Sequence, residues 1–294
     1  MSDKKRKRRI GDRAEGRKLR TLNPMSRIES YIMPKRSDAQ NFFTEKLDIS
    51  EAEKMCREQI RNGNKNFSLM HIIIAAYIRT VSQRPAINRF ISGQTVYARN
   101  TIEVVMTIKK KMTLDSEDTV IKVQFDPRDT IYDVYDKFNK EVEANKGDTE
   151  GNDTESFAKV LNYVPRGVLR FLVWVIKGLD YYGLLPRAII NLSPFHGSLA
   201  ITSMGSLGIR PIYHHIYDFG NLPVFVAYGA KQHGVKMNNE EEVVKYRYIE
   251  LKVTTDERIC DGYYYASAFK MMKKIFENPS VLENPPETIV EDID

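Results

Sequence analysis

The chain has 294 residues, of which 42% are hydrophobic, so it can bury the core of one large domain or of two small ones. Its two cysteines exclude the disulfide framework of a small secreted protein, and no histidine–cysteine cluster has the spacing of a zinc site. We therefore expect a cytoplasmic protein with no metal and no covalently bound cofactor.

The net charge of +6 is concentrated at the N-terminus. Residues 1–20 hold ten basic and three acidic side chains, whereas the rest of the chain holds 35 basic and 36 acidic ones. A basic run of this kind can bind nucleic acid or an anionic membrane, but it is more often a solvated arm. We predict a disordered basic arm over residues 1–26, and we expect deletion of residues 1–24 to leave the fold intact.

Globular composition begins near residue 27 and continues to about residue 279. Ser50 and Glu53 have the spacing of a capping box, which predicts a helix over residues 50–61. A run of apolar residues predicts a buried helix over residues 68–81. Further elements follow from apolar alternation and turn residues: strands over 41–49, 95–99, 103–109, 119–125, 198–201, 223–230 and 246–253, and helices over 129–142 and 263–276.

Residues 157–185 form the most apolar part of the chain. Arg166, Arg170, Lys177 and Asp180 interrupt it, so no uncharged stretch reaches the roughly 20 residues that a membrane span needs. A helix that is apolar on nearly every side is buried in a core or contacts another subunit or a membrane surface. We expect burial and subunit contact here.

The segment Thr255-Asp256-Glu257-Arg258-Ile259-Cys260-Asp261-Gly262-Tyr263 joins the last predicted strand to the last predicted helix. Aspartate followed by glycine suits a tight turn, and acidic side chains are favourable near a helix N-terminus. From the residues alone, an acidic cap at a helix start is the simplest interpretation.

The same segment resembles the H-x-x-x-D-G signature of the chloramphenicol acetyltransferase and dihydrolipoyl acyltransferase superfamily. Asp261 and Gly262 match its last two residues. Asp256 and Arg258 match the dihydrolipoyl form, D-H-R-V-x-D-G, but the catalytic histidine of the family falls on Glu257. A second match is Thr202-Ser203-Met204-Gly205-Ser206-Leu207-Gly208-Ile209, which resembles S-N-L-G-x-x-G-I of the dihydrolipoyl branch.

The resemblance implies an α/β fold. This is a two-layer sandwich with a mixed β-sheet flanked by helices, chloramphenicol-acetyltransferase-like and assembled as a homotrimer. It would occupy residues 27–279, with residues 280–294 as an acidic tail. Thr202 or Ser203 would donate to the oxyanion of the reaction. Asp261 and Gly262 would serve the structure of the site, and Arg36 is the candidate partner of Asp261.

Glu257 cannot simply replace a histidine base, since its reference pKa of about 4.3 lies roughly two units below that of histidine. Burial can raise the pKa of a glutamate towards about 6–7. His196 is an alternative base from a neighbouring subunit, although an ordinary loop histidine explains it better.

Three hypotheses follow. In the first, the chain is a catalytically impaired acyltransferase-family protein that serves as a trimeric scaffold or binding module. In the second, it is a working enzyme that takes an acyl group from acyl-coenzyme A, with Glu257 or another residue as base. In the third, it is an adaptor whose basic arm binds nucleic acid or an anionic membrane. Coenzyme A or acyl-coenzyme A is the expected small-molecule partner in the first two.

Overall fold

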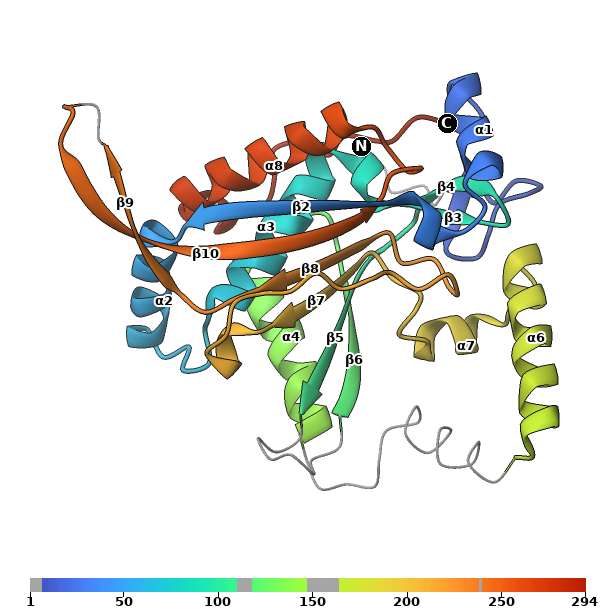
Figure 1. Cartoon of the computed structure of the whole chain (residues 1–294). Coiled ribbons are helices and arrows are strands. Elements are labelled where there is room, and N and C mark those ends of the chain that lie inside the picture. The colour runs from blue at the N-terminus through green and yellow to red at the C-terminus, as the bar shows by residue number, and fades with distance from the viewer. Residues whose placement is uncertain (1–6, 110–117, 147–163, 238–239) are drawn as a thin grey trace.

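The computed structural model describes residues 7–109, 118–146, 164–237 and 240–294 (Figure 1). A mixed sheet, seven-stranded in this described part, forms its centre, in the order β2-β10-β8-β7-β5-β6 with β9 paired to β10. The β5–β7 and β7–β8 pairs are parallel, and the others are antiparallel. The strands are β2 (Gln40–Asp48), β5 (Ile102–Lys109), β6 (Asp118–Phe125), β7 (Leu199–Ser203), β8 (Val224–Tyr228), β9 (Gln232–Met237) and β10 (Val243–Asp256).

Helices cover one face of this sheet (Figure 1). Alternate residues of β10 explain the layering: Leu251 and Val253 are buried in the core shared with the helices, whereas Lys252 lies on the opposite face, beside Tyr213. The helices are α2 (Ser50–Arg61), α3 (Leu69–Gln83), α4 (Ile131–Lys146) and α8 (Gly262–Glu277). The predicted two-layer architecture of a mixed sheet flanked by helices is therefore confirmed.

A small second sheet has the order β1-β4-β3 and lies next to helix α1. Its strands are β1 (Gly16–Lys18), β3 (Arg89–Ser92) and β4 (Thr95–Arg99), and α1 spans Pro24–Ile32. The turn between β3 and β4 contains Gly93 and Gln94, both with positive φ, as a tight hairpin turn requires. This sheet brings the N-terminal segment onto the body of the protein.

The N-terminal arm differs from the sequence expectation over residues 7–26, whereas residues 1–6 lie outside the described part. Strand β1 pairs with β4, and Leu19 is only 2% exposed. The backbone N–H groups of Arg20 and Thr21 donate to the carbonyl of Asp294 at 2.9 and 2.6 Å. The basic arm and the acidic tail hold each other in place, through long-range contacts that local composition does not reveal.

Where the structure describes the apolar segment, it contradicts the expected burial, whereas the expected subunit contact stays a prediction. Helix α6 (Arg166–Tyr182) has no buried residue along its fully described length, so it is not part of the core of its own chain. The short helix α7 (Arg187–Leu192) buries Ile190 and leads towards β7. Within the described residues, every helix is too short or too polar to cross a lipid bilayer.

Candidate functional site

The end of strand β10 carries a buried cluster of three charges. Asp256 is fully buried, and its carboxylate accepts hydrogen bonds from Arg258 at 2.8 Å (Nε to Oδ1) and 2.7 Å (Nη2 to Oδ2). The Arg36 Nε donates to Asp256 Oδ2 at 3.2 Å, and Arg36 itself is 4% exposed. One carboxylate shared by two guanidinium groups fixes the backbone on both sides of Glu257.

Arg36 also ties together two other segments, strand β3 and the loop before β8. Its guanidinium donates to the carbonyl oxygens of Tyr217 at 2.6 Å, Gly220 at 3.0 Å and Ile91 at 3.3 Å. Burial, opposed by Asp256 and reinforced by the charge of Arg258, lowers the pKa of Arg36 below its ordinary value. Arg36 therefore acts as a structural clamp beside the candidate site.

The structure pairs Arg36 with Asp256 and not with Asp261, which corrects the sequence-based interpretation. Asp261 is exposed and caps helix α8, where its side chain accepts a hydrogen bond from the backbone N–H of Tyr264 at 2.8 Å. Gly262 has no positive φ, and a Cβ there would meet nothing within 4 Å. Asp261 thus serves helix capping, and the turn does not require glycine at position 262.

Glu257 is partly buried at the surface next to this cluster. Its Oε2 accepts a hydrogen bond from Asn41 Nδ2 at 2.8 Å, and its backbone N–H donates to the carbonyl of Ala39 at 2.9 Å. Burial, together with the charges of Glu257 and Asp261, raises the pKa of Glu29 on α1. Glu257 therefore belongs to a group of three neighbouring carboxylates. The signature motif gives no hint of Glu29 and Asn41, which come from other parts of the chain.

Thr202 and Ser203 lie at the end of β7, far from Glu257 in the same chain. In the register of the sheet, Thr202 pairs with Ala227 of β8, and Ala227 pairs with Lys252 of β10. Glu257 follows Lys252 by five positions, which corresponds to roughly 16 Å along an extended strand. A single chain therefore does not bring the predicted base and the predicted oxyanion donors together.

Ser203 lines a cavity of about 710 Å³ between the sheet, one side of α2 and the start of α3. The cavity wall also contains Arg57, Lys231 and Arg247, and Glu53 pairs with Lys231 at 2.6 Å and with Arg247 at 3.0 Å. Burial raises the pKa of Tyr228, and the Ser203 hydroxyl is hydrogen-bonded to it. The Ser203 end of the sheet thus combines hydroxyl groups with a basic rim.

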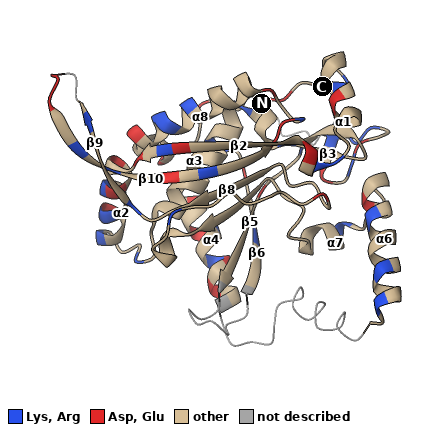
Figure 2. Cartoon of the chain, viewed as in Figure 1, with Lys and Arg blue, Asp and Glu red and all other residues tan. Residues whose placement is uncertain are grey.

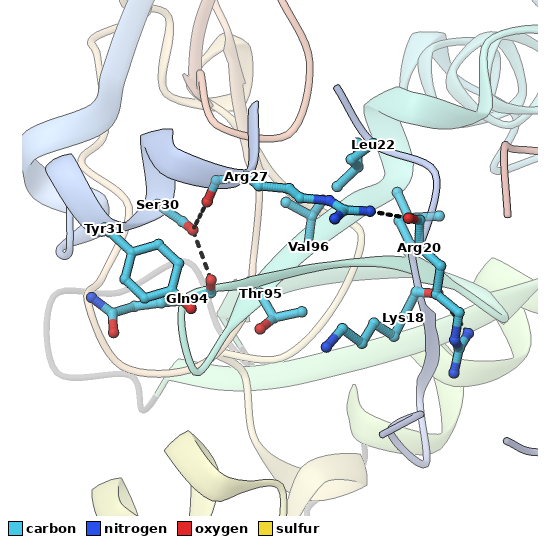
Figure 3. A pocket seen from close by; sticks show the side chains of 10 residues that line it. Lys18, Arg20, Leu22, Arg27, Ser30, Tyr31, Gln94, Thr95 and Val96 are labelled. Carbon is cyan, nitrogen blue, oxygen red and sulfur yellow. Dashed lines mark hydrogen bonds between the residues drawn. The ribbon is translucent and has the colours of Figure 1, made fainter. Parts of the chain in front are cut away.

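A second, smaller cavity of about 360 Å³ lies between α1, β1 and β4 (Figure 3). Lys18, Arg20 and Arg27 line it from one side, and Ser30 donates to the carbonyl of Gln94 at 2.7 Å. It contains none of the side chains predicted for the catalytic site, so we assign it no role in that site.

His196 is fully buried and does not face the candidate site. Its Nδ1 is 2.8 Å from Ser193 Oγ, and its Nε2 is 3.1 Å from Asp180 Oδ1 at the end of α6. Both ring nitrogens are engaged, so His196 positions α6 and is not free to serve as a base.

Known structures with this architecture include dihydrolipoamide acetyltransferases. A probable enzyme of this kind from Listeria monocytogenes matches with a TM-score of 0.55 and 12% sequence identity, covering 89% of this chain and 95% of that one. The Azotobacter vinelandii dihydrolipoamide acetyltransferase matches with a TM-score of 0.54 and 12% identity over 90% and 93% of the two chains. The cubic core of a pyruvate dehydrogenase multienzyme complex gives a TM-score of 0.53 and 12% identity over 88% of each chain.

By sequence, no family model and no curated protein matches this chain. The structural likeness nevertheless extends over nearly the whole length of both chains in each comparison. The chain therefore has the fold of the dihydrolipoamide acetyltransferases. The resemblance to the chloramphenicol acetyltransferase and dihydrolipoyl acyltransferase superfamily, inferred from residues 202–209 and 256–262, is confirmed at the level of the fold.

Proposed function

We propose that this chain is a divergent acyltransferase-fold protein that binds an acyl-coenzyme A thioester in an oligomeric site and lacks histidine-dependent acyl transfer. The observation that carries the proposal is Glu257, which replaces the expected base and lies beside Glu29 and Asp261. Acyl transfer builds negative charge on the substrate oxygen, which the protein must stabilise with donors or cations. Three carboxylates at this position oppose such charge.

The Azotobacter relative supports this interpretation. A serine, a histidine and an asparagine were investigated for their roles in its catalytic mechanism, and its histidine and asparagine are four positions apart. Glu257 and Asp261 have the same spacing, and both are acidic. The hydroxyl group of the serine has a counterpart in this chain at Thr202 or Ser203, whereas the histidine and the asparagine do not. The buried charge cluster around Asp256 supports the backbone of the site.

We also propose that the working unit is a homotrimer. Glu257 and Ser203 lie at opposite ends of the sheet, so a site that uses both must take them from two copies of the chain. One relative forms the cubic core of a multienzyme complex, which supports oligomerisation in this fold. Phe42 is 54% exposed and Tyr213 is 40% exposed on the sheet face that lacks helices. Exposed aromatic rings of this kind suit a contact between copies of the chain.

A second candidate function is catalysis with Glu257 as the base. It is favoured by the hydrogen bond that Glu257 Oε2 accepts from Asn41 Nδ2 at 2.8 Å, because this contact holds the carboxylate in a defined orientation. The third hypothesis, an adaptor that uses the basic arm, gains less support. Within residues 7–26, Arg9 and Arg17 pair with Asp294, and Arg20 pairs with Asp12.

The deciding experiment combines calorimetric titration of coenzyme A and acetyl-coenzyme A with an assay of acetyl transfer to a dithiol. We expect the wild type to bind acetyl-coenzyme A without turnover, Glu257→Gln to behave like the wild type, and Glu257→His to gain thiol acetylation. Robust turnover that Glu257→Gln abolishes would establish the second candidate instead. Absence of binding by both coenzyme A forms would contradict both.

A further inference from the structure

Helix α6 is attached to the rest of the described chain at its C-terminal end (Figure 1). Arg13 donates to the carbonyls of Asp180 at 2.9 Å and Tyr181 at 2.6 Å, and the Tyr181 hydroxyl donates to Gln94 Oε1 at 2.7 Å. The 17 residues of α6, all of them described, include no buried side chain. Its apolar residues therefore find no core within the described part of the chain.

The basic residues of α6 are exposed and lie together on one side of the helix. At about 100° per residue, the three basic residues of the helix fall within an arc of about 40°. Lys177 belongs to this arc and, with Asp180 and Tyr181, lines a crevice of about 220 Å³ against the body. Six apolar residues fall within an arc of about 100° on the opposite side, and they are Val168, Phe171, Leu172, Val175, Leu179 and Tyr182.

The outward side of α6 is unusually apolar for an exposed surface and is bordered by positive charge. Phe171, Trp174 and Tyr182 are 60%, 70% and 74% exposed, and Leu184 after the helix is 66% exposed. Figure 2 shows the lysine and arginine positions of α6 in blue. Residues 164–192 contain four basic and one acidic side chain, a net charge of +3.

We propose that α6, together with the adjoining α7, docks in the plane of an anionic lipid surface. Helices that lie in a membrane interface combine an apolar stripe containing Trp, Phe and Leu with a basic polar face, as α6 does. Trp174 lies between the basic arc and the apolar arc, where an amphipathic ring fits the headgroup region. Leu169 and Ile176 are half-buried, so they mark the side of α6 nearest the body. The exposed rings of Phe171, Trp174 and Tyr182 therefore stay accessible to lipid.

The net charge of +3 is what favours lipid over a second copy of this chain. Anionic lipids attract each nearby cation, whereas the cores of protein interfaces are depleted in charged side chains. A contact between two apolar stripes would gain nothing from Arg166 and Arg170, which lie on the basic arc next to Trp174. This inference concerns α6 alone and does not depend on whether the Glu257 site is catalytic.

Trp174 is the single tryptophan of the chain, so its fluorescence reports on the proposed surface directly. The full-length protein is titrated with vesicles of phosphatidylcholine, with and without phosphatidylglycerol. We expect anionic vesicles to shift the emission to shorter wavelength and brominated lipid to quench it. The double variant Phe171→Glu/Leu172→Glu should lose both effects with its melting temperature unchanged, because neither side chain is buried.

Two further variants separate the contributions. The double variant Arg166→Gln/Arg170→Gln should bind anionic vesicles about 20-fold more weakly than the wild type does. Its affinity for neutral vesicles should equal that of the wild type. A deletion of residues 2–6 should preserve the Trp174 shift. The proposal is overturned if vesicles leave Trp174 emission unchanged, or if the deletion alone abolishes binding. Acrylamide quenching of Trp174 fluorescence without lipid gives a further test. The proposal is also overturned if quenching becomes weaker as the protein concentration rises, because a second copy of the chain then covers the stripe.

Discussion

Arg36 Nε lies 3.2 Å from Asp256 Oδ2, although 220 positions separate the two residues in the sequence. This contact joins the segment before β2 to the last residue of β10, in a place where both side chains are almost fully buried. The residue after Asp256 is Glu257, so the ion pair supports the very position at which the signature histidine is missing. The ion pair therefore holds the backbone in place beside Glu257, the residue on which the proposed function depends.

We predict that Asp256→Asn destabilises the protein by about 3–5 kcal/mol, because it leaves the guanidinium groups of Arg36 and Arg258 buried without a counter-charge. Urea unfolding measures the loss. The matched control is Asp261→Asn, since asparagine caps a helix about as well as aspartate does, and we expect a change below about 0.5 kcal/mol. Equal effects of the two substitutions would contradict the assignment of the buried charge to Asp256.

The carboxylate cluster predicts a pH-dependent effect of Glu257→Gln. The raised pKa of Glu29 means that the folded state binds a proton more tightly than the unfolded state. Its contribution to stability therefore falls as pH rises from the unfolded pKa through the folded one. Removal of the Glu257 charge lowers the pKa of Glu29, and glutamine can still accept the hydrogen bond from Asn41.

We thus expect Glu257→Gln to be more stable than the wild type at pH 7, with the difference shrinking as the pH falls towards about 4. Unfolding in urea across this range provides the measurement, and an NMR titration of Glu29 should show its pKa decrease. A variant that is equally stable at every pH would show that the three carboxylates do not interact.

Local patterns in the sequence predict the central elements well. The capping-box pattern at Ser50 gives α2 with its observed bounds, although Ser50 itself accepts no capping bond and donates instead to Asp48 at 2.6 Å. The apolar run over residues 68–81 corresponds to α3, in which thirteen of fifteen residues are buried. Such elements are predictable because their burial follows from periodicity within one segment.

The candidate site is less predictable because long-range contacts assemble it. The signature motif places Glu257 at a strand end, but its neighbours Glu29 and Asn41 come from segments more than 200 positions away. Composition likewise suggests a disordered arm over residues 1–26. The residues around Leu19 give no sign that Asp294, at the other end of the sequence, lies beside them. Apolar content alone also suggests a buried α6, since it does not reveal whether another element covers the helix.

We predict that deletion of residues 1–24 costs at least about 2 kcal/mol of stability, in contrast to the sequence-based expectation. The deletion removes strand β1 and the side chain of Leu19, and loss of one buried leucine alone costs about that much. Thermal unfolding is the measurement. Deletion of residues 2–6 is the control, because it leaves strand β1 and Leu19 in the chain. If the chain without residues 1–24 melts at the same temperature as the full-length chain, the arm contributes no packing.

We predict that Phe42→Glu weakens self-association without lowering the stability of the separate chain. Phe42 is 54% exposed on the sheet face that lacks helices, and its ring lies 5.3 Å from that of Tyr213. Native mass determination should give a multiple of 34.0 kDa for the wild type, three chains in our proposal, and a smaller species for the variant. The control is Val281→Glu, which changes a 40% exposed residue after α8. Identical masses for wild type and Phe42→Glu would exclude this face as the contact.

The attachment of α6 gives a final prediction, which rests on two glycines with different surroundings. Gly183 ends α6 with φ +72, and a Cβ there would collide with the guanidinium of Arg13. Gly178 lies inside the helix, and a Cβ there would meet nothing within 4 Å. Alanine at position 183 must therefore adopt a strained left-handed conformation and displace Arg13, at a cost of about 1–2 kcal/mol.

Hydrogen exchange over residues 166–182 distinguishes the two substitutions. Gly183→Ala should speed exchange in α6 by roughly 5- to 30-fold, because the helix loses its anchor on Arg13. Gly178→Ala should slow exchange, since alanine stabilises a helix interior by about 0.5–1 kcal/mol relative to glycine. If both variants exchange at the wild-type rate, α6 is held by contacts other than those of Arg13 with Asp180 and Tyr181.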